Sequence, residues 1–204
     1  TIVAAPVQAP AVGALEFRLV ETIDPMGVSP IVDVKSGDFD SDGDSDLVVA
    51  VTAGLFLYEG DGAGGYTSAD YQAAYFPITC LDVGFYNTDS RLDIVTGDQE
   101  GWLCVFLGTG TLELDATPTT YDLDHPIGSI ATIRLDSDES SDWVVTRPDQ
   151  DDIVLCFNNG SGGVSSIDDR YQAYDSTPTD VAAVDLNGDM QRDIAILCSG
   201  FPAV

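Results

Sequence analysis

Four acidic segments with one common pattern recur along the chain about every 50 residues. They begin at residues 38, 85, 134 and 185, and each ends in an aspartate that leads directly into an apolar, β-rich run. A period of this length is typical of stacked or radial repeat folds, in which each repeat is one supersecondary unit that packs on its neighbours. The spacing therefore predicts a repeat protein built from β-strands.

The first segment carries the oxygen ligands that a calcium ion requires. Its sequence is Asp38-Phe39-Asp40-Ser41-Asp42-Gly43-Asp44-Ser45-Asp46. Acidic side chains stand at loop positions 1, 3, 5 and 9, and glycine stands at position 6, where a tight turn needs a positive φ. Ca²⁺ takes about six to eight oxygen ligands at ~2.3–2.6 Å, and alternating carboxylates on a curling loop supply them. The segment therefore predicts a calcium loop.

The other three segments keep this pattern to different degrees. Their sequences are Phe85-Tyr86-Asn87-Thr88-Asp89-Ser90-Arg91-Leu92-Asp93, Arg134-Leu135-Asp136-Ser137-Asp138-Glu139-Ser140-Ser141-Asp142 and Asp185-Leu186-Asn187-Gly188-Asp189-Met190-Gln191-Arg192-Asp193. One Asp-x-Asp-x-Asp arises easily by chance in a chain this acidic. Four copies in register, each before a β-rich strand, do not.

These loops resemble the calcium loops of FG-GAP/VCBS repeats, the β-propeller blades of integrin α-subunit heads and of many secreted bacterial proteins. The resemblance extends from about Phe17 to Leu197. It implies an all-β, propeller-like array of four blades of about 50 residues, with the calcium loop between the first two strands of each blade.

The same resemblance implies two sets of calcium ligands. In the first loop these are the side chains of Asp38, Asp40, Asp42 and Asp46 with the carbonyl of Asp44. In the fourth loop they are the side chains of Asp185, Asn187, Asp189 and Asp193 with the carbonyl of Gln191. The fourth loop has Met190 where the turn prefers glycine, so we expect strain and weaker binding there. One or two structural Ca²⁺ ions are expected in total.

The two middle loops lack the first ligand. Phe85 replaces it in the second loop, which leaves a weak set of Asn87, Asp89 and Asp93. Arg134 replaces it in the third loop, where a guanidinium directed at the loop aspartates would take the place of the ion. We therefore expect the third loop to be free of metal and held by an internal ion pair.

The order of strand-forming runs predicts one domain with a preceding arm. Residues 1–14 form an N-terminal arm that carries no charged side chain, and residues 15–204 form the propeller domain, with repeats at about 15–66, 67–115, 116–166 and 167–204. Each repeat is expected to open with an outer strand, at 16–20, 71–75, 120–123 and 171–174. The fourth repeat contains only two inner strands, so its blade is expected to be incomplete. The N-terminal arm of the same chain or a neighbouring chain would complete it, or the chain is a fragment of a larger protein that has further blades.

Composition narrows the class of protein and its partners. The formal net charge is −28, from 35 acidic and seven basic residues. Such a chain repels nucleic acid and anionic membranes, and no stretch approaches the ~18–20 apolar residues of a membrane span. Calcium loops together with an acidic surface predict a secreted or cell-surface protein. The four cysteines (Cys80, Cys104, Cys156 and Cys198) leave two disulfides or four packed thiols as alternatives.

The sequence offers little for catalysis. His125 is the only histidine, and carboxylates are too abundant for any pair of them to be informative. We therefore expect no enzyme, but a module for adhesion, recognition or extracellular assembly. The alternatives are a filament subunit built by strand addition and a lectin-like module. Trp102 and Trp143 are expected to pack between blades, with a sugar- or peptide-binding groove as their alternative role. The expected partners are other copies or an extracellular protein or glycan, and Asn159 is a glycosylation candidate.

Overall fold

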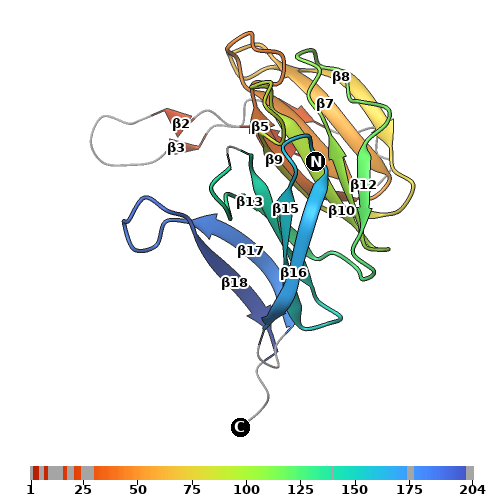
Figure 1. Ribbon diagram of the computed structural model, residues 1–204. Coiled ribbons are helices and arrows are strands. Elements are labelled where there is room, and N and C mark those ends of the chain that lie inside the picture. The colour runs from red at the N-terminus through yellow and green to blue at the C-terminus, as the bar shows by residue number, and fades with distance from the viewer. Residues whose placement is uncertain are drawn as a thin grey trace.

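The computed structural model describes residues 2–4, 7–8, 16–17, 21–23, 30–138, 140–173 and 177–200. In this part of the chain the regular elements are all β-strands, so no helix there could span a membrane. Antiparallel sheets follow one another along the chain and fan out around a common side of the molecule (Figure 1). The predicted all-β class is confirmed.

Three of the sheets have four strands in the order of the sequence. The first contains β5 (Ile31–Gly37), β6 (Asp46–Val51), β7 (Gly54–Gly60) and β8 (Tyr66–Ala73). The second contains β9 (Ile78–Gly84), β10 (Asp93–Asp98), β11 (Trp102–Phe106) and β12 (Thr119–Asp122). The third contains β13 (Ser129–Ile133), β14 (Asp142–Arg147), β15 (Asp152–Asn158) and β16 (Val164–Gln172). The fourth sheet has two described strands, β17 (Thr177–Val184) and β18 (Asp193–Ser199).

The sheets are offset from the predicted repeats by one strand. The outer strands predicted to open the second, third and fourth repeats overlap β8, β12 and β16. Each of these three strands instead pairs with the third strand of the sheet before the predicted repeat. Hydrogen bonding therefore makes each of them the last strand of its sheet, since successive strands of an antiparallel meander pair as neighbours. Each acidic loop still connects the first two strands of a sheet, as the resemblance implied.

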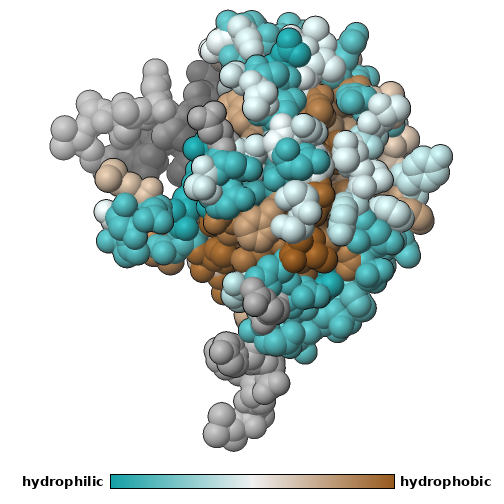
Figure 2. All heavy atoms as spheres, in the orientation of Figure 1, coloured by the Kyte–Doolittle hydropathy of each residue, from teal (hydrophilic) through white to brown (hydrophobic). Residues whose placement is uncertain are grey.

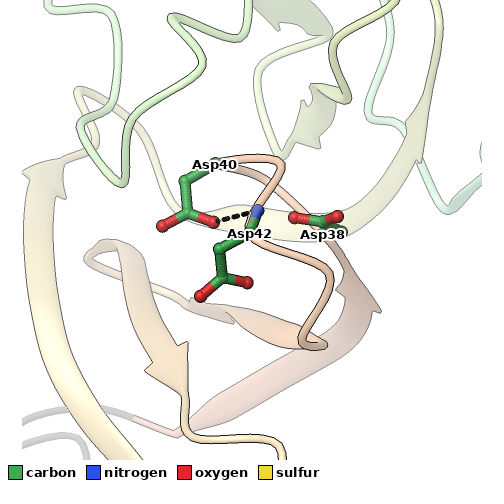
Figure 3. A group of neighbouring side chains, drawn as sticks. All are labelled: Asp38, Asp40 and Asp42. Atoms are coloured by element: carbon green, nitrogen blue, oxygen red, sulfur yellow. Dashed lines mark hydrogen bonds between the residues drawn. The ribbon is translucent and has the colours of Figure 1, made fainter.

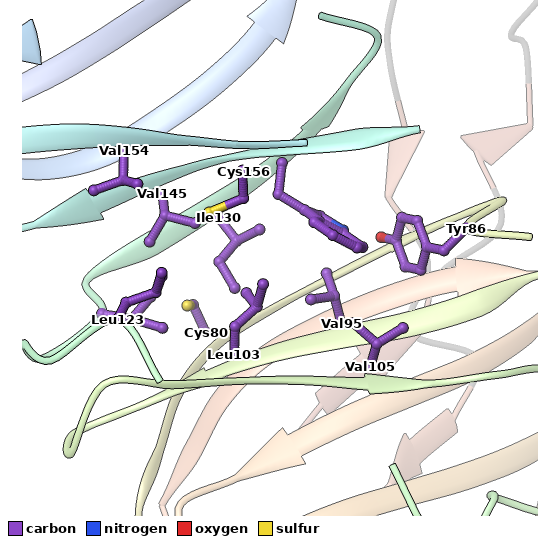
Figure 4. Packing of buried hydrophobic residues seen from close by; sticks show 12 residues of the cluster. Cys80, Tyr86, Val95, Leu103, Val105, Leu123, Ile130, Val145, Val154 and Cys156 are labelled. Atoms are coloured by element: carbon purple, nitrogen blue, oxygen red, sulfur yellow. The ribbon is translucent and has the colours of Figure 1, made fainter. Parts of the chain in front are cut away.

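The sheets pack face to face and share their cores. The first strands β5, β9, β13 and β17 contact one another in that order, and every residue of β6 and β10 is buried. Figure 4 shows the cluster between the second and third sheets, which includes Cys80, Val95, Val145 and Cys156. Trp143 is fully buried there against Tyr86, with ring centroids 5.0 Å apart. Stacked antiparallel sheets that share cores in this way form the blades of a β-propeller.

The described strands of the N-terminal segment pair among themselves. β1 (Ile2–Ala4) pairs with β4 (Glu21–Ile23), and β2 (Val7–Gln8) pairs with β3 (Glu16–Phe17). None of these four strands joins β17 or β18. Most of the predicted arm, the rest of the first outer strand and the tail after residue 200 lie outside the described residues.

All four cysteines are free. Cys80 on β9 and Cys104 on β11 are separated by β10, as expected from their places in one sheet. Burial raises the pKa of the Cys80 and Cys156 thiols to about 12 and that of Cys104 to about 11. Thiols in such surroundings are unreactive and pack as small apolar groups.

Candidate metal centre

The first acidic loop curls around the carboxylate of Asp38 (Figure 3). Ser41 and Gly43 have φ angles of 68° and 95°, so the positive φ expected at position 6 is present. These two residues donate their N–H groups to the two oxygens of Asp38, at 2.7 and 3.1 Å. The N–H of Asp42 reaches Asp40 at 3.1 Å, and the N–H of Asp44 reaches Asp42 at 2.8 Å. The backbone of the loop therefore fixes all three carboxylates.

These three carboxylates form a compact group of oxygens. One oxygen each of Asp38, Asp40 and Asp42 lies within 4.8 Å of the other two. Asp42 is exposed, and the other two are half-buried. Each carboxylate oxygen has two lone pairs and uses at most one of them for the bonds above, so lone pairs stay free for a further ligand. The donor set fits a hard divalent cation, because three negative charges this close repel one another unless a cation lies between them.

The last aspartate of each acidic loop has a different position from the other acids. We call Asp46, Asp93, Asp142 and Asp193 the closing aspartates. Asp46 is fully buried, and it accepts the N–H of Phe39 within the loop at 2.9 Å and the N–H of Gly60 at the end of β7 at 3.0 Å. It therefore ties the loop to the third strand. The sequence predicted Asp46 as a metal ligand but did not indicate its contact with Gly60, which is distant in sequence. Lone pairs of the Asp46 carboxylate remain free, so its role as a ligand stays a prediction.

The next two closing aspartates make the same pair of hydrogen bonds. Asp93 accepts the N–H groups of Tyr86 and Gly108, at 2.6 and 2.7 Å. Asp142 accepts those of Leu135 and Asn158, at 2.7 and 2.8 Å. Burial raises the pKa of both carboxyls, and the N–H bonds oppose that rise. The contact is therefore a structural feature of every complete sheet, independent of how well its loop suits a metal ion.

The fourth loop has the same conformation as the first. Gly188 and Met190 have φ angles of 82° and 68° and donate their N–H groups to Asp185, at 2.6 and 2.9 Å. These bonds lower the pKa of the Asp185 carboxyl. Asn187 accepts the N–H of Asp189 at 2.8 Å. Met190 thus adopts the positive φ that was predicted to strain this loop.

The rest of the predicted fourth set keeps the same order. Asp189 accepts the N–H of Gln191 at 2.8 Å, and the closing aspartate Asp193 accepts the N–H of Leu186 at 2.9 Å. An amide at position 3 replaces the carboxylate of Asp40, so this loop has one negative charge fewer among its first three ligands. The loop fits the same ion with a weaker donor set.

The second loop lacks the carboxylate at position 1, as the sequence indicated. Asn87 accepts the N–H of Asp89 at 2.9 Å, and Asp89 accepts the N–H of Arg91 at 3.0 Å. The guanidinium of Arg91 lies 3.7 Å from the Asp89 carboxylate and compensates part of its charge. Both differences make this loop a poorer calcium site than the first.

The ion pair predicted for the third loop is not formed by the described residues. Asp136 and Asp138 accept the backbone N–H groups of Asp138 and Ser140, and no ion pair joins Arg134 to an aspartate of the described part of this loop. Arg134 is exposed and lines a cavity of about 700 Å³ together with Arg192. The two aspartates accept backbone N–H groups of their own loop, and Arg134 lies exposed beside a cavity that Asp136 also lines.

The other candidate residues are placed apart from one another. Trp143 is buried between sheets, whereas Trp102 lines a mostly apolar pocket of about 370 Å³ between the first two sheets with the exposed Tyr75 and Phe76. His125 Nδ1 lies 3.0 Å from Asp149 at the surface. Asn159 is exposed in the turn after β15.

The sheets and their hairpin connections define the class of fold as a β-propeller. The chain is similar to BBS1N in two crystal structures of BBS1N in complex with ARL6DN. In the crystal soaked with mercury the TM-score is 0.62 at 12% identity, over 98% of this chain and 57% of that chain. In the crystal soaked with lead the TM-score is 0.58 at 16% identity, over 85% and 50%.

These similarities establish the fold alone, because the identities are low. The chain spans only 50–57% of the length of the chains that it matches. No protein family matches the sequence, and no curated protein matches it.

Proposed function

We propose that this chain is an FG-GAP/VCBS-type β-propeller, stabilised by calcium, that presents a rigid surface for adhesion, recognition or assembly outside the cell. The observation that carries the proposal is the group formed by Asp38, Asp40 and Asp42, whose oxygens approach within 4.8 Å. The proposed role is binding, without a catalytic step.

Calcium would act through the acidic loops. In the first loop the ion takes the three grouped carboxylates, the carbonyl of Asp44 and a remaining lone pair of Asp46. A second ion takes Asp185, Asn187, Asp189, Asp193 and the carbonyl of Gln191. Each ion removes two of the 28 net negative charges, which relieves the repulsion that opposes a compact fold.

The proposed location outside the cell rests on the calcium affinity proposed for the first loop and on the negative charge of the chain. Extracellular calcium modules bind with dissociation constants of roughly 10⁻⁴–10⁻³ M, and an affinity in this range is proposed for the first loop. The acidic surface disfavours nucleic acid as a partner and leaves a protein, a glycan or other copies of the chain. BBS1N is in complex with ARL6DN in the similar structures, which supports a propeller of this kind as a surface for protein binding.

Calcium titration of matched variants tests the proposal. Asp42→Asn removes one charge from the first loop, and Asp138→Asn makes the same change at position 5 of the third loop, where Arg134 replaces the first ligand. We expect isothermal titration calorimetry to show calcium binding that Asp42→Asn weakens at least tenfold and that Asp138→Asn leaves unchanged, because a carboxylate ligand to Ca²⁺ is lost in the first variant only. Absence of calcium binding, or equal weakening by both variants, would overturn the assignment.

A lectin-like role is the second candidate, and the pocket between the first two sheets favours it. Trp102, Tyr75 and Phe76 line this pocket together with the polar Gln72 and Thr120. Aromatic faces flanked by polar groups suit a sugar ring. Glycan-array binding that Trp102→Ala abolishes, with the melting temperature in calcium preserved, would support this role; an array without any bound glycan would exclude it.

A further inference from the structure

The pocket of about 370 Å³ between the first two sheets combines mostly apolar walls with one buried carboxylate. Leu55 and Gln72 line it from the first sheet, and Trp102 and Asp98 line it from the second. Asp98 is only 6% exposed, and it is the one charged side chain among the described residues of the lining. Small-molecule sites commonly have volumes of about 300–1,000 Å³. The pocket therefore has the size of a ligand site and presents a single negative charge.

The carboxylate of Asp98 uses only one of its two oxygens within the chain. Oδ1 accepts the N–H groups of Glu100 and Trp102, both at 2.9 Å, in the turn between β10 and β11. No hydrogen bond from the described residues reaches Oδ2, and no ion pair joins Asp98 to a described cation. Burial and then the negative charge of Asp98 raise the pKa of Cys104, which also lines the pocket. Asp98 therefore brings an acceptor without a donor to this lining.

The third sheet has a cation at the corresponding place. Arg147 ends β14 as Asp98 ends β10, and Asp152 begins β15 as Trp102 begins β11. The guanidinium of Arg147 binds the carboxylate of Asp152 through two hydrogen bonds, at 2.6 and 2.9 Å. At this corner the third sheet therefore contains an acid with its cation, whereas the second sheet contains an acid with an aromatic ring.

An aromatic ring beside a carboxylate favours a cation as the ligand. The face of a tryptophan ring attracts cations, and a carboxylate attracts them more strongly in apolar surroundings than in water. Tyr75 and Phe76 also line the pocket, and because they are 101% and 41% exposed they form its rim. A neutral sugar, the ligand of the lectin-like candidate, would leave the charge of Asp98 buried without a counter-charge. The lining therefore suits a cation with an apolar body.

The hydrogen bonds of Asp98 favour an ammonium over a guanidinium. A guanidinium binds a carboxylate best through two parallel bonds to both oxygens, as Arg147 binds Asp152. Oδ1 of Asp98 already accepts two N–H groups, so only Oδ2 is left for a ligand. An ammonium is a compact charge that needs no fork of two oxygens, and Gln72 and Thr120 offer further oxygen acceptors in the lining.

We propose that this pocket binds a small primary ammonium compound with an apolar body. The ammonium donates to Oδ2 of Asp98, and the apolar body lies between Trp102 and the aliphatic walls from the first sheet. The formal net charge of −28 and the mostly hydrophilic face in Figure 2 favour the approach of a cation over that of an anion.

The site is separate from the acidic loops. Asp98 and the closing aspartate Asp93 stand at opposite ends of β10, so the pocket lies at the end of the sheets that is distant from the loops. It contains none of the proposed calcium ligands. A failed calcium titration would therefore leave this site in place, and a pocket that binds no ammonium would leave the calcium proposal in place.

NMR titration with three compounds of equal chain length tests the class of ligand. The probes are hexylammonium, hexylguanidinium and 1-hexanol, and the readout is the indole N–H signal of Trp102. The signal of the fully buried Trp143 is the internal reference, since the chain has two tryptophans. We expect hexylammonium to shift the Trp102 signal saturably, and to bind at least tenfold more tightly than hexanol and at least threefold more tightly than hexylguanidinium. Absence of a shift, equal binding of hexanol, or tighter binding of hexylguanidinium would overturn the proposal.

A matched pair of variants tests the role of Asp98. Asp98→Asn keeps one oxygen for the two backbone N–H groups and replaces Oδ2 by an N–H donor. Asp122→Asn is the control, because Asp122 lies opposite Trp102 on β12, accepts the N–H of Asp124 at 2.9 Å and does not line the pocket. Asp98→Asn is expected to weaken the binding of hexylammonium at least tenfold and to leave that of hexanol within twofold.

The control is expected to leave the affinity for hexylammonium within twofold. Equal weakening by both variants would show a general attraction to the acidic surface and would overturn the assignment of the site. The comparison of the three compounds on the unchanged chain decides the question if Asp98→Asn does not fold.

A primary ammonium ends both a free alkylamine and a lysine side chain. A lysine within a peptide brings polar backbone groups to the aromatic rim, where their desolvation costs affinity. We therefore expect hexylammonium to bind at least threefold more tightly than the peptide acetyl-Gly-Lys-Gly-amide in the same titration. Tighter binding of the peptide would overturn the assignment of a free amine as the ligand.

Discussion

The carboxylate of Asp142 accepts the backbone N–H of Asn158 at 2.8 Å, and both residues are buried. The side chain of Asn158 continues this contact, because its amide donates to the carbonyls of Tyr86 and Ser141, at 2.7 and 3.0 Å. Tyr86 belongs to the second acidic loop and Asp142 to the third. One hydrogen-bond network therefore joins a loop to its own third strand and to the neighbouring sheet.

Asp142→Asn is expected to destabilise the protein by about 1–3 kcal/mol. The new amide turns an NH₂ group towards one of the two N–H donors, Leu135 or Asn158, and leaves that buried donor without an acceptor. Chemical denaturation at neutral pH measures the loss. Asp138→Asn in the same loop is the control and is expected to change the stability by less than about 0.5 kcal/mol, because its carboxylate is exposed. Equal losses would contradict a special role for the closing aspartate.

The raised pKa values of Asp93 and Asp142 predict a pH dependence of stability. Burial places the folded-state pKa of both above the reference value of 3.8, so the folded state binds protons more readily than the unfolded state. The penalty for their charged forms is fully present above the folded pKa and is lost as the pH falls through it towards 3.8.

A double variant isolates this effect. In Asp93→Asn/Asp142→Asn the two titrations are absent, whereas the many other carboxylates still titrate. As the pH is lowered from 7 to about 4.5, the free energy of unfolding of the original chain is therefore expected to increase relative to that of the variant. Urea denaturation at each pH measures this difference. A constant difference over this range would show that burial does not shift these two groups.

Exchange of glycine and methionine between the first and fourth loops is expected to change calcium affinity in opposite directions. Gly43 and Met190 both have a positive φ, which costs a side-chain-bearing residue roughly 1–2 kcal/mol. Gly43 has open space around its Cβ position and Met190 is exposed, so the backbone conformation is the main difference. Met190→Gly is expected to tighten binding at the fourth loop, and Gly43→Met to weaken it at the first, each by about tenfold in titration calorimetry. Changes in the same direction would show that strain at position 6 does not govern affinity.

Thiol reactivity tests the burial of the cysteines. The pKa of Cys80 and of Cys156 is raised to about 12, so the thiolate fraction at pH 7 is negligible in the native state. Iodoacetamide is expected to leave both residues unmodified in the folded protein and to modify all four cysteines in denaturant, as read by mass spectrometry. Fewer than four modified thiols in denaturant without a reductant would show that a disulfide is present.

The acidic period predicted the fold well because its signal is local and repeated. Each loop determines its own turn through side chain to backbone bonds within nine residues, and the flanking apolar runs form the strands on either side. The positive φ of Gly43 followed from these local rules, whereas the curl of the loop around the Asp38 carboxylate was not predicted. The assignment of the outer strands needed hydrogen-bond partners from another part of the chain, and the sequence does not show which neighbour such a strand joins.

Two site residues had roles that depend on contacts distant in sequence. Asp46 appeared as one more ligand, because its second partner Gly60 lies at the far end of the next strand. Arg134 appeared as a substitute for the ion, but no ion pair joins it to Asp136 or Asp138, which accept backbone N–H groups of the loop. The alternation of side chains around an acidic loop can be read from the sequence. The partner that a long, flexible side chain such as that of Arg134 takes cannot.

In the three complete sheets the closing aspartates also favour the native strand register. If the third strand of a sheet slips by one residue, its terminal N–H turns to the opposite neighbour, and a buried carboxylate such as that of Asp93 or Asp142 loses a donor. An unmatched buried charge is far more costly than the loss of one ordinary ladder bond. In the three complete sheets a misaligned third strand is therefore less stable than the native register.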